Sequence, residues 1–127
     1  MNIKRIDHFV LTIEDINKSK WFYGEVLGME IITFNNDRVA AKFGDQKINF
    51  HETGCEIKPH AYSPVRGSSD FCLVSDDTVE NLRTHLKDNG IVVELGPVKR
   101  TGSLGPIFSI YIRDPDKNLI EISTYNH

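Results

Sequence analysis

The sequence predicts an α+β fold of two tandem βαβββ modules, whose strands form one cup-shaped mixed sheet with the helices outside. Three observations predict it: an internal repeat, two helix patterns that each end at a glycine, and three strand patterns after each helix. The 127 residues fit one domain with a real core. We expect a single domain over residues 1–127, with module 1 at about 1–53, a linker at about 54–69 and module 2 at about 70–127.

The internal repeat is clearest at the start of each module. The stretch IDHFVLTIED aligns with SDFCLVSDD, which places His8 on Asp70 at an offset of 62 residues. Gly28 and Gly90, which follow the two helix patterns, are separated by the same 62 residues. Agreement at two separate landmarks favours a duplicated unit over a chance match.

Each module carries one amphipathic helix pattern. The first runs from about Asp15 to Leu27 and the second from about Asp77 to Asn89, each with its apolar residues near one stripe. Asp77 and Glu80 have the spacing of a capping box. The glycine after each pattern ends the helix, because glycine enters the left-handed conformation without steric cost.

Three strand patterns follow each helix. They are MEIITF, RVAAKF and KINFHE in module 1, and IVVEL, FSIYIRD and NLIEIST in module 2. Residues 96–106 hold three glycines and two prolines around Lys99 and Arg100, and we predict a long loop there. A basic, flexible loop over a cup is either a lid that binds an anionic substrate or a solvated loop.

Strand alternation decides which side chains enter the cup. In the first strand, Phe9, Leu11 and Ile13 suit packing under the helix, so His8 lies on the inner face. The other polar or small residues expected on the inner faces are Val10, Thr12, Asn49, His51, Asp70, Cys72, Ser109, Tyr111, Glu121 and Ser123.

A carboxylate on the inner face of an apolar strand is costly unless it is paired. If a pseudo-two-fold axis relates the modules, the inner polar residues meet near that axis, and a divalent cation would neutralise the carboxylates. The predicted metal ligands are His8, His51, Asp70 and Glu121.

Each predicted ligand also has a structural interpretation. His8 is then a surface or capping residue, Asp70 a turn cap, and Glu121 the partner of Arg113 or Lys47. The identity of the ligand on the last strand of module 1 also stays open, because the repeat aligns Asn49, and not His51, with Glu121.

Composition excludes several classes of protein. The net charge of −3 with interspersed signs argues against nucleic-acid or membrane-surface binding. No apolar run approaches the roughly 20 residues that span a bilayer, and the start of the chain lacks a signal-peptide pattern. Two cysteines without a C-x-x-C spacing favour a reducing compartment. We expect a cytoplasmic protein.

With these residues the chain resembles the vicinal-oxygen-chelate superfamily, which includes glyoxalase I, fosfomycin- and bleomycin-resistance proteins and extradiol dioxygenases. The matching stretches are IDHFVLTIEDINKSKWFYGEVLGME and RDPDKNLIEIS. GDQKINFHE and VKRTGSLGPIFSIYIRDPDKNLIEIS resemble its small glyoxalase-domain-containing branch. The resemblance covers nearly the whole chain.

The resemblance implies one divalent metal ion, either Zn, Ni, Mn, Fe or Co. The family's first and last ligands fall on His8 and Glu121. In the family, the ligand that opens the second module is often His, but this chain has Asp70 there. The ligand in the last strand of the first module is often Glu, but this chain has Asn49, with His51 two residues on.

The implied activity is that of a metal-dependent lyase or isomerase, similar to lactoylglutathione lyase, which acts through an enediolate. Glu121 would shuttle the proton, and Arg100 and Tyr111 would contact the small-molecule substrate. The alternatives are an extradiol catechol dioxygenase, which needs two His and one carboxylate, and a non-catalytic drug-binding protein. The resemblance also implies a homodimer.

Overall fold

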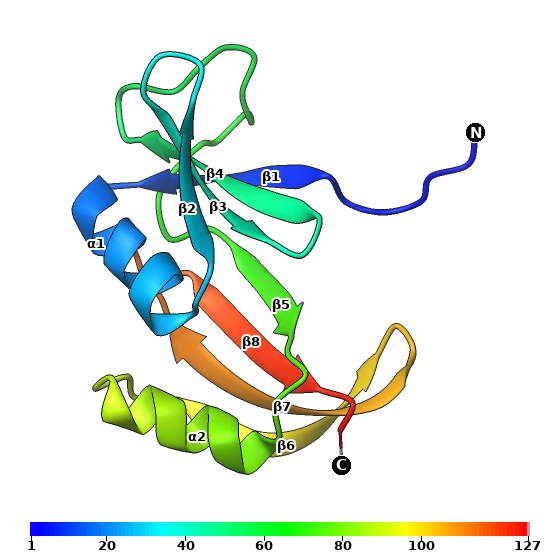
Figure 1. Cartoon of the computed structure of the whole chain (residues 1–127). Coiled ribbons are helices and arrows are strands. Elements are labelled where there is room, and N and C mark those ends of the chain that lie inside the picture. Colours follow the sequence, from blue (N-terminus) through cyan, green and yellow to red (C-terminus); the bar gives the residue numbers. More distant parts are fainter. Residues whose placement is uncertain (127) are drawn as a thin grey trace. The chain divides into compact units, whose positions relative to one another are not determined.

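The two modules are separate compact units in the structure, a computed structural model that describes residues 1–126 (Figure 1). One unit spans Met1–Ser68 and the next begins at Ser69. His127, the last residue of the predicted domain, lies outside the described residues.

The first unit has a mixed four-stranded sheet in the order β1-β4-β3-β2. β1 and β4 are parallel, and the other neighbours are antiparallel. Its elements are β1 (His8–Ile13), α1 (Ile16–Lys20), the π-helical η1 (Trp21–Val26), β2 (Glu30–Phe34), β3 (Arg38–Phe43) and β4 (Gln46–Glu52).

The second unit repeats this topology in the order β5-β8-β7-β6, again with its first and last strands parallel. Its elements are β5 (Asp70–Val74), α2 (Val79–Asp88), β6 (Leu95–Gly102), β7 (Gly105–Arg113) and β8 (Leu119–Thr124). The predicted α+β fold of two βαβββ modules is thereby confirmed.

In the first unit, the helix covers the predicted apolar face of the sheet. The Asp15 side chain caps α1 by accepting a hydrogen bond from the Asn17 amide at 2.9 Å. The continuous α1–η1 segment buries Phe22 and Tyr23, and the Tyr23 ring lies 5.4 Å from that of Phe50 on β4. Because neighbouring residues of a strand face opposite sides, residues 49 and 51 of β4 point away from the helix.

In the second unit, α2 lies alongside the sheet (Figure 1) and contributes the buried Leu86. The buried isoleucines of β7 and β8 are Ile107, Ile110, Ile112, Ile120 and Ile122. The turn between these strands is fixed by Asp114, whose Oδ1 accepts hydrogen bonds from the amides of Asp116 and Asn118, each at 2.9 Å. The DPDKN stretch is therefore a structural turn that sets the start of β8.

Two predictions in module 2, one of a strand and one of a loop, are wrong. Residues 91–94 of IVVEL are not in a strand, and the predicted loop at 96–106 is mostly strand, because β6 pairs with β7 up to Gly102. Gly96, which favours a loop, instead marks a register shift inside β6, where an added Cβ would lie only 2.5 Å from the Ser109 carbonyl oxygen. Lys99 and Arg100 lie on this strand, so the predicted flexible loop that carries them is also wrong.

The predicted capping box at the second helix is wrong as well. Thr78 is the N-cap, and its Oγ1 accepts a hydrogen bond from the Asn81 amide at 3.2 Å. Asp77 instead exchanges hydrogen bonds with the Ser75 hydroxyl, 3.1 Å away. Asp77 and Glu80 have the capping-box spacing, but the chain enters the helix one residue later. Gly28 and Gly90 end their helices at φ values of 75° and 73°, as predicted.

Two further observations bear on composition. Cys55 and Cys72 are free thiols, which agrees with the absence of a predicted disulfide framework. Over the described residues, every helix is too short or too polar to cross a lipid bilayer.

Candidate functional site

The polar face of the first sheet holds two buried side chains on β4. Asn49 pairs in register with Val10, and His51 with Thr12, which confirms that they share the face of His8. Their side chains are only 4% and 7% exposed, yet Asn49 Oδ1 and His51 Nε2 have no hydrogen-bond partner. Buried polar atoms are almost always satisfied in folded proteins. The two atoms therefore mark a position where a ligand would supply the missing interaction.

The imidazole of His51 lies in an environment that favours its neutral form. Burial lowers its pKa from the usual 6.5, and the guanidinium of Arg38 lowers it further, while Glu56 opposes the shift. A neutral imidazole has a free lone pair, which is what a metal ion requires of a histidine ligand.

His8 lies at the start of β1 and is exposed. Its Nδ1 is 2.7 Å from Asp7 Oδ2, and this hydrogen bond lowers the pKa of the Asp7 carboxyl. A carboxylate on one ring nitrogen fixes the tautomer and leaves the other nitrogen as an acceptor, an arrangement that is common for metal-binding histidines.

Glu121 lies on β8, beside Cys72 of β5 and opposite Tyr111 of β7. Its Oε2 accepts a hydrogen bond from the Ser109 hydroxyl at 2.6 Å and lies 3.2 Å from Ser123 Oγ. The carboxylate is thus held by hydroxyl groups and not by a cation.

The alternative ion pair of Glu121 with Arg113 is not formed, and Lys47 belongs to the first unit. Arg113 makes a two-pronged ion pair with Glu94, with distances of 3.0 and 3.1 Å, and the ammonium of Lys47 lies over the Phe34 ring. Within residues 69–126, Glu121 therefore has no cationic side chain as an ion-pair partner, which suits a metal ligand or a catalytic base.

A chain of hydrogen bonds ends on the Glu121 carboxylate. Cys72 Sγ lies 3.1 Å from Ser123 Oγ, and Ser123 Oγ lies 2.6 Å from Ser109 Oγ. The Ser109 hydroxyl donates to Glu121, so Cys72, Ser123 and Ser109 form a connected chain of polar groups behind the carboxylate. Sequence reasoning missed that Ser123 holds the carboxylate, although its same-face spacing from Glu121 was visible.

Cys72 is not placed as a nucleophile. Burial raises the pKa of its thiol, and the Glu121 carboxylate raises it further, while the hydrogen bond with Ser123 acts in the opposite direction. The thiol is the weakly reactive form of cysteine, so the arrangement favours a structural role.

Arg100 and Tyr111 are brought together on neighbouring strands of the second sheet. Arg100 Nε donates a hydrogen bond to Tyr111 Oη at 3.0 Å, and its guanidinium carbon lies 5.5 Å from the ring centre. The Arg100 side chain is exposed. Its remaining N–H groups are thus presented from a strand and not from a flexible loop.

Asp70 is the first residue of β5 and is exposed, so the expected cost of burying its charge does not arise. Its carboxylate contributes to the raised pKa of Arg113.

The first unit contains two of the predicted ligands, His8 and His51, and the second contains Asp70 and Glu121. Among residues 1–126, no three His, Cys, Asp or Glu side chains are grouped closely enough to hold a metal ion. The chemistry of the donors still fits such an ion, since imidazole nitrogen and carboxylate oxygen suit divalent transition metals, and His51 Nε2 is buried without a partner.

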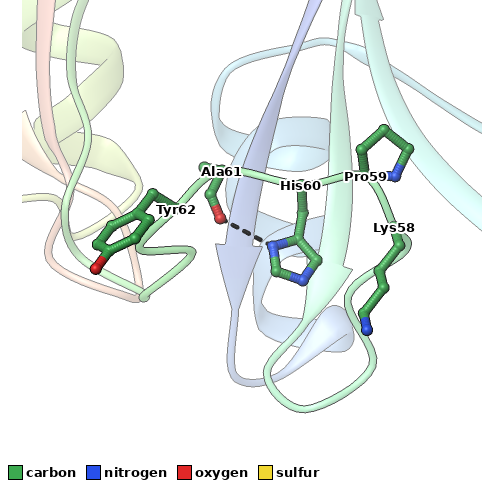
Figure 2. A pocket seen from close by; sticks show the side chains of 5 residues that line it. All are labelled: Lys58, Pro59, His60, Ala61 and Tyr62. Atoms are coloured by element: carbon green, nitrogen blue, oxygen red, sulfur yellow. Dashed lines mark hydrogen bonds between the residues drawn. The ribbon is translucent and has the colours of Figure 1, made fainter.

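The segment after β4 forms a hollow of its own (Figure 2). It is lined by five consecutive residues, Lys58 to Tyr62, and His60 Nδ1 lies 2.8 Å from the Ala61 carbonyl oxygen. None of the predicted site residues lines it.

Comparison with known proteins identifies the superfamily. Residues 5–122 match the family model of the Glyoxalase/Bleomycin resistance protein/Dioxygenase superfamily. The glyoxalase domain-containing protein RDO1 of Mycosarcoma maydis is 48% identical over 98% of this chain and 70% of its own length.

Solved structures agree with this result. The virulence protein STM3117 of Salmonella typhimurium is 49% identical, with a TM-score of 0.96 over 98% of this chain and 99% of that one. An integron cassette protein from V. cholerae is 47% identical, with a TM-score of 0.96 over 99% and 98% of the two chains.

A lactoylglutathione lyase from Agrobacterium tumefaciens shares the fold at 24% identity, with a TM-score of 0.74 over 98% of this chain and 96% of that one. The match of the family model over most of the chain, together with relatives almost half identical, assigns this protein to the glyoxalase/bleomycin resistance protein/dioxygenase superfamily.

Proposed function

We propose that this protein is a metal-dependent lyase or isomerase of the glyoxalase kind, which acts on a small substrate with two vicinal oxygens through an enediolate. The observation that carries the proposal is the Glu121 carboxylate, which is fixed by the Ser109 hydroxyl at 2.6 Å and has no cationic partner among the described residues. A fixed, uncompensated carboxylate on a strand is suited to move a proton next to a carbonyl group.

The proposed cofactor is one divalent ion of Zn, Ni, Mn, Fe or Co, with His8, His51, Asp70 and Glu121 as its ligands. The support is the donor set and the orphaned Nε2 of His51. Such an ion would supply Lewis-acid polarisation of the substrate oxygens.

The other residues have proposed roles in orientation. Ser109 holds Oε2 of Glu121, which leaves Oε1 to face the reacting carbon or the metal site. Tyr111 fixes Arg100 Nε, and the remaining guanidinium N–H groups would contact an oxygen-rich end of the substrate.

The test combines metal analysis with activity. We expect about one equivalent of a divalent metal in the purified protein and turnover of the hemithioacetal of methylglyoxal. Glu121→Gln should abolish turnover, and His51→Gln should lower metal content. The control is His85→Gln, which removes an exposed histidine of α2 that is not a predicted ligand. A metal-free protein in which His8→Ala, His51→Gln and Glu121→Gln all keep full activity would sink the proposal.

A second candidate is an extradiol dioxygenase, because His51, with its buried Nε2, adds a second histidine to His8 and Glu121 in the proposed ligand set. Two histidines and one carboxylate form the ligand set of non-haem Fe(II) oxygenases. Anaerobic loading with Fe(II), followed by catechol and oxygen, should then give a yellow ring-cleaved product.

A third candidate is a non-catalytic binding protein. TnmS3, an antibiotic binding protein from Streptomyces, shares the fold at 21% identity with a TM-score of 0.77. Ligand affinity that survives chelation of all metal, together with the absence of turnover, would favour this candidate over both enzymes. The cytoplasmic location and the homodimer stay predictions, and sedimentation tests the latter.

A further inference from the structure

Phe34, at the end of β2, has cationic groups near its ring from two other strands. The guanidinium carbon of Arg38 lies 5.0 Å from the ring centre, and the ammonium nitrogen of Lys47 lies 3.8 Å from it. Both cations therefore lie within 5.0 Å of one point on the polar face of the first sheet. The attraction of an aromatic ring for a cation does not neutralise the charge of either group.

Carboxylates on the described part of the chain do not neutralise this pair. Neither Arg38 nor Lys47 forms an ion pair within residues 1–126. Asp7, whose pKa responds to Lys47, is instead held by His8 at 2.7 Å. On the neighbouring strand, Glu30 lies in register with Lys42. Two adjacent cations without a counter-charge indicate a place where an anion is favourable.

The neighbouring strand positions add buried polar groups to the same face. Ala40 of β3 lies in register with Asn49 of β4, and Arg38 is two residues from Ala40 on the same face of the sheet. Asn49 Oδ1 and His51 Nε2 are the buried atoms without partners on this face, and Arg38 is close enough to lower the pKa of His51. The cations and the orphaned polar atoms thus belong to one surface of β2, β3 and β4.

We propose that Arg38 and Lys47 bind one anionic group of the ligand, a carboxylate or a phosphate, on the polar face of the first sheet beside Phe34. The inference rests on the proposed function only in taking this face as part of the ligand site, and it deepens that function by naming the substrate class: a small organic acid or phosphate ester. This site lies in the first module, whereas Arg100 and Tyr111 belong to the second.

The test is binding of simple probes, followed by NMR of the intact protein. Benzoate and phenyl phosphate represent the two anion chemistries, and benzyl alcohol is the uncharged control. We expect the anions to shift the side-chain signals of Asn49, His51 and Arg38. Benzyl alcohol should bind at least about tenfold more weakly, the effect of losing one charged hydrogen bond. The probe that binds more tightly, benzoate or phenyl phosphate, identifies the anionic group of the ligand.

Substitutions assign the site. Arg38→Gln and Lys47→Gln should each weaken anion binding by about tenfold or more. Lys87→Gln on α2 removes the same charge elsewhere and should leave binding unchanged, and its normal spectrum verifies that charge loss alone does not unfold the protein. Equal affinity for benzyl alcohol and benzoate, or full affinity in Arg38→Gln and Lys47→Gln, overturns the inference. So does the absence of shifts with any anion at millimolar concentration, or a loss of binding in Arg100→Gln only.

Measurements with and without EDTA separate this inference from the proposed enzyme. Suppose that the protein shows no metal and no turnover, yet anion binding still depends on Arg38 and Lys47. This result supports the inference and contradicts the proposed lyase. Turnover that is unaffected by Arg38→Gln and Lys47→Gln, with no effect of either variant on KM or on probe binding, contradicts the inference and leaves the lyase standing.

Discussion

The Ser109 hydroxyl donates a hydrogen bond of 2.6 Å to Oε2 of Glu121, and both residues lie on the polar face of the second sheet. Ser109 is fully buried and also contacts Ser123 Oγ at 2.6 Å. One serine therefore fixes both the carboxylate and the hydroxyl chain behind it.

The first prediction concerns this serine. Ser109→Ala removes the donor to Glu121 and leaves buried polar atoms unsatisfied, so the free energy of unfolding should fall by about 1–3 kcal/mol. Metal affinity should fall by about tenfold or more, because the ligand carboxylate loses its orientation. Urea unfolding and metal titration measure the two effects. Ser68→Ala, at an exposed position, should change neither, and a Ser109→Ala protein with wild-type metal affinity would rule out the orienting role.

The second prediction concerns the two thiols. Both thiols are exposed, but partial burial raises the pKa of Cys72 and its Sγ lies 3.1 Å from Ser123 Oγ, so iodoacetamide at pH 8 should modify Cys55 well before Cys72. Glu121→Gln removes a negative charge that raises the Cys72 pKa, and it should speed the alkylation of Cys72. Mass spectrometry of peptides at timed intervals gives both rates. Faster labelling of Cys72 in the wild-type protein contradicts the hydrogen-bonded placement of its thiol.

The third prediction tests the strand at Gly96. An added Cβ would lie 2.5 Å from the Ser109 carbonyl oxygen, and φ at this residue is 115°. Gly96→Ala should therefore lower the unfolding free energy by more than about 2 kcal/mol. Gly44→Ala is the matched control: φ is 52° there and no atom lies within 4 Å of the added carbon, so the loss should be about 1 kcal/mol. Equal losses in thermal unfolding would show that Gly96 does not approach β7 this closely.

The fourth prediction concerns pH. The pKa of His51 is lowered in the folded protein from 6.5, so below pH 6.5 the unfolded state binds a proton that the folded state resists. Stability should therefore be fully present above about pH 6.5 and fall as the pH drops through the folded pKa. In EDTA, wild-type protein should lose more unfolding free energy between pH 7.5 and 5.5 than His51→Gln. Parallel pH profiles for the two proteins would mean that His51 is not buried in its neutral form.

The fifth prediction concerns metal removal. An ion that binds only the folded state raises its stability by mass action, so EDTA should lower the melting temperature of the purified protein, and added Zn²⁺ or Mn²⁺ should restore it. His51→Gln should reduce this difference, while His85→Gln on α2 should keep it. If the protein contains metal and EDTA does not change its melting temperature, the proposed ligand set is contradicted.

How much of the candidate site the sequence predicted depends on the kind of contact. Because side chains alternate between the two faces of a strand, the sequence predicts which residues share a face. The structure confirms this for Asn49 and His51 on β4 and for Glu121 and Ser123 on β8. The register even preserves the equivalence of Asn49 with Glu121, since Asn49 pairs with Val10 as Glu121 pairs with Cys72. The suggested pairing of Arg113 with Glu121 is wrong, because Arg113 pairs with Glu94 instead. A sequence gives the charges of the side chains but not the distances between them.

The sequence by itself determined the two modules, the C-terminal ends of their helices and the faces of their strands. These features depend on hydrophobic periods of 2 and 3.6 residues and on the positions of glycine, which are local properties of the chain. Only the tertiary structure decided that residues 96–102 form a strand, since pairing with β7 outweighs the local preference of glycine and proline for loops. It also decided that His51 is buried without a partner and that Arg38 and Lys47 meet at Phe34. These contacts join different strands, and their distances are set by packing across the sheet.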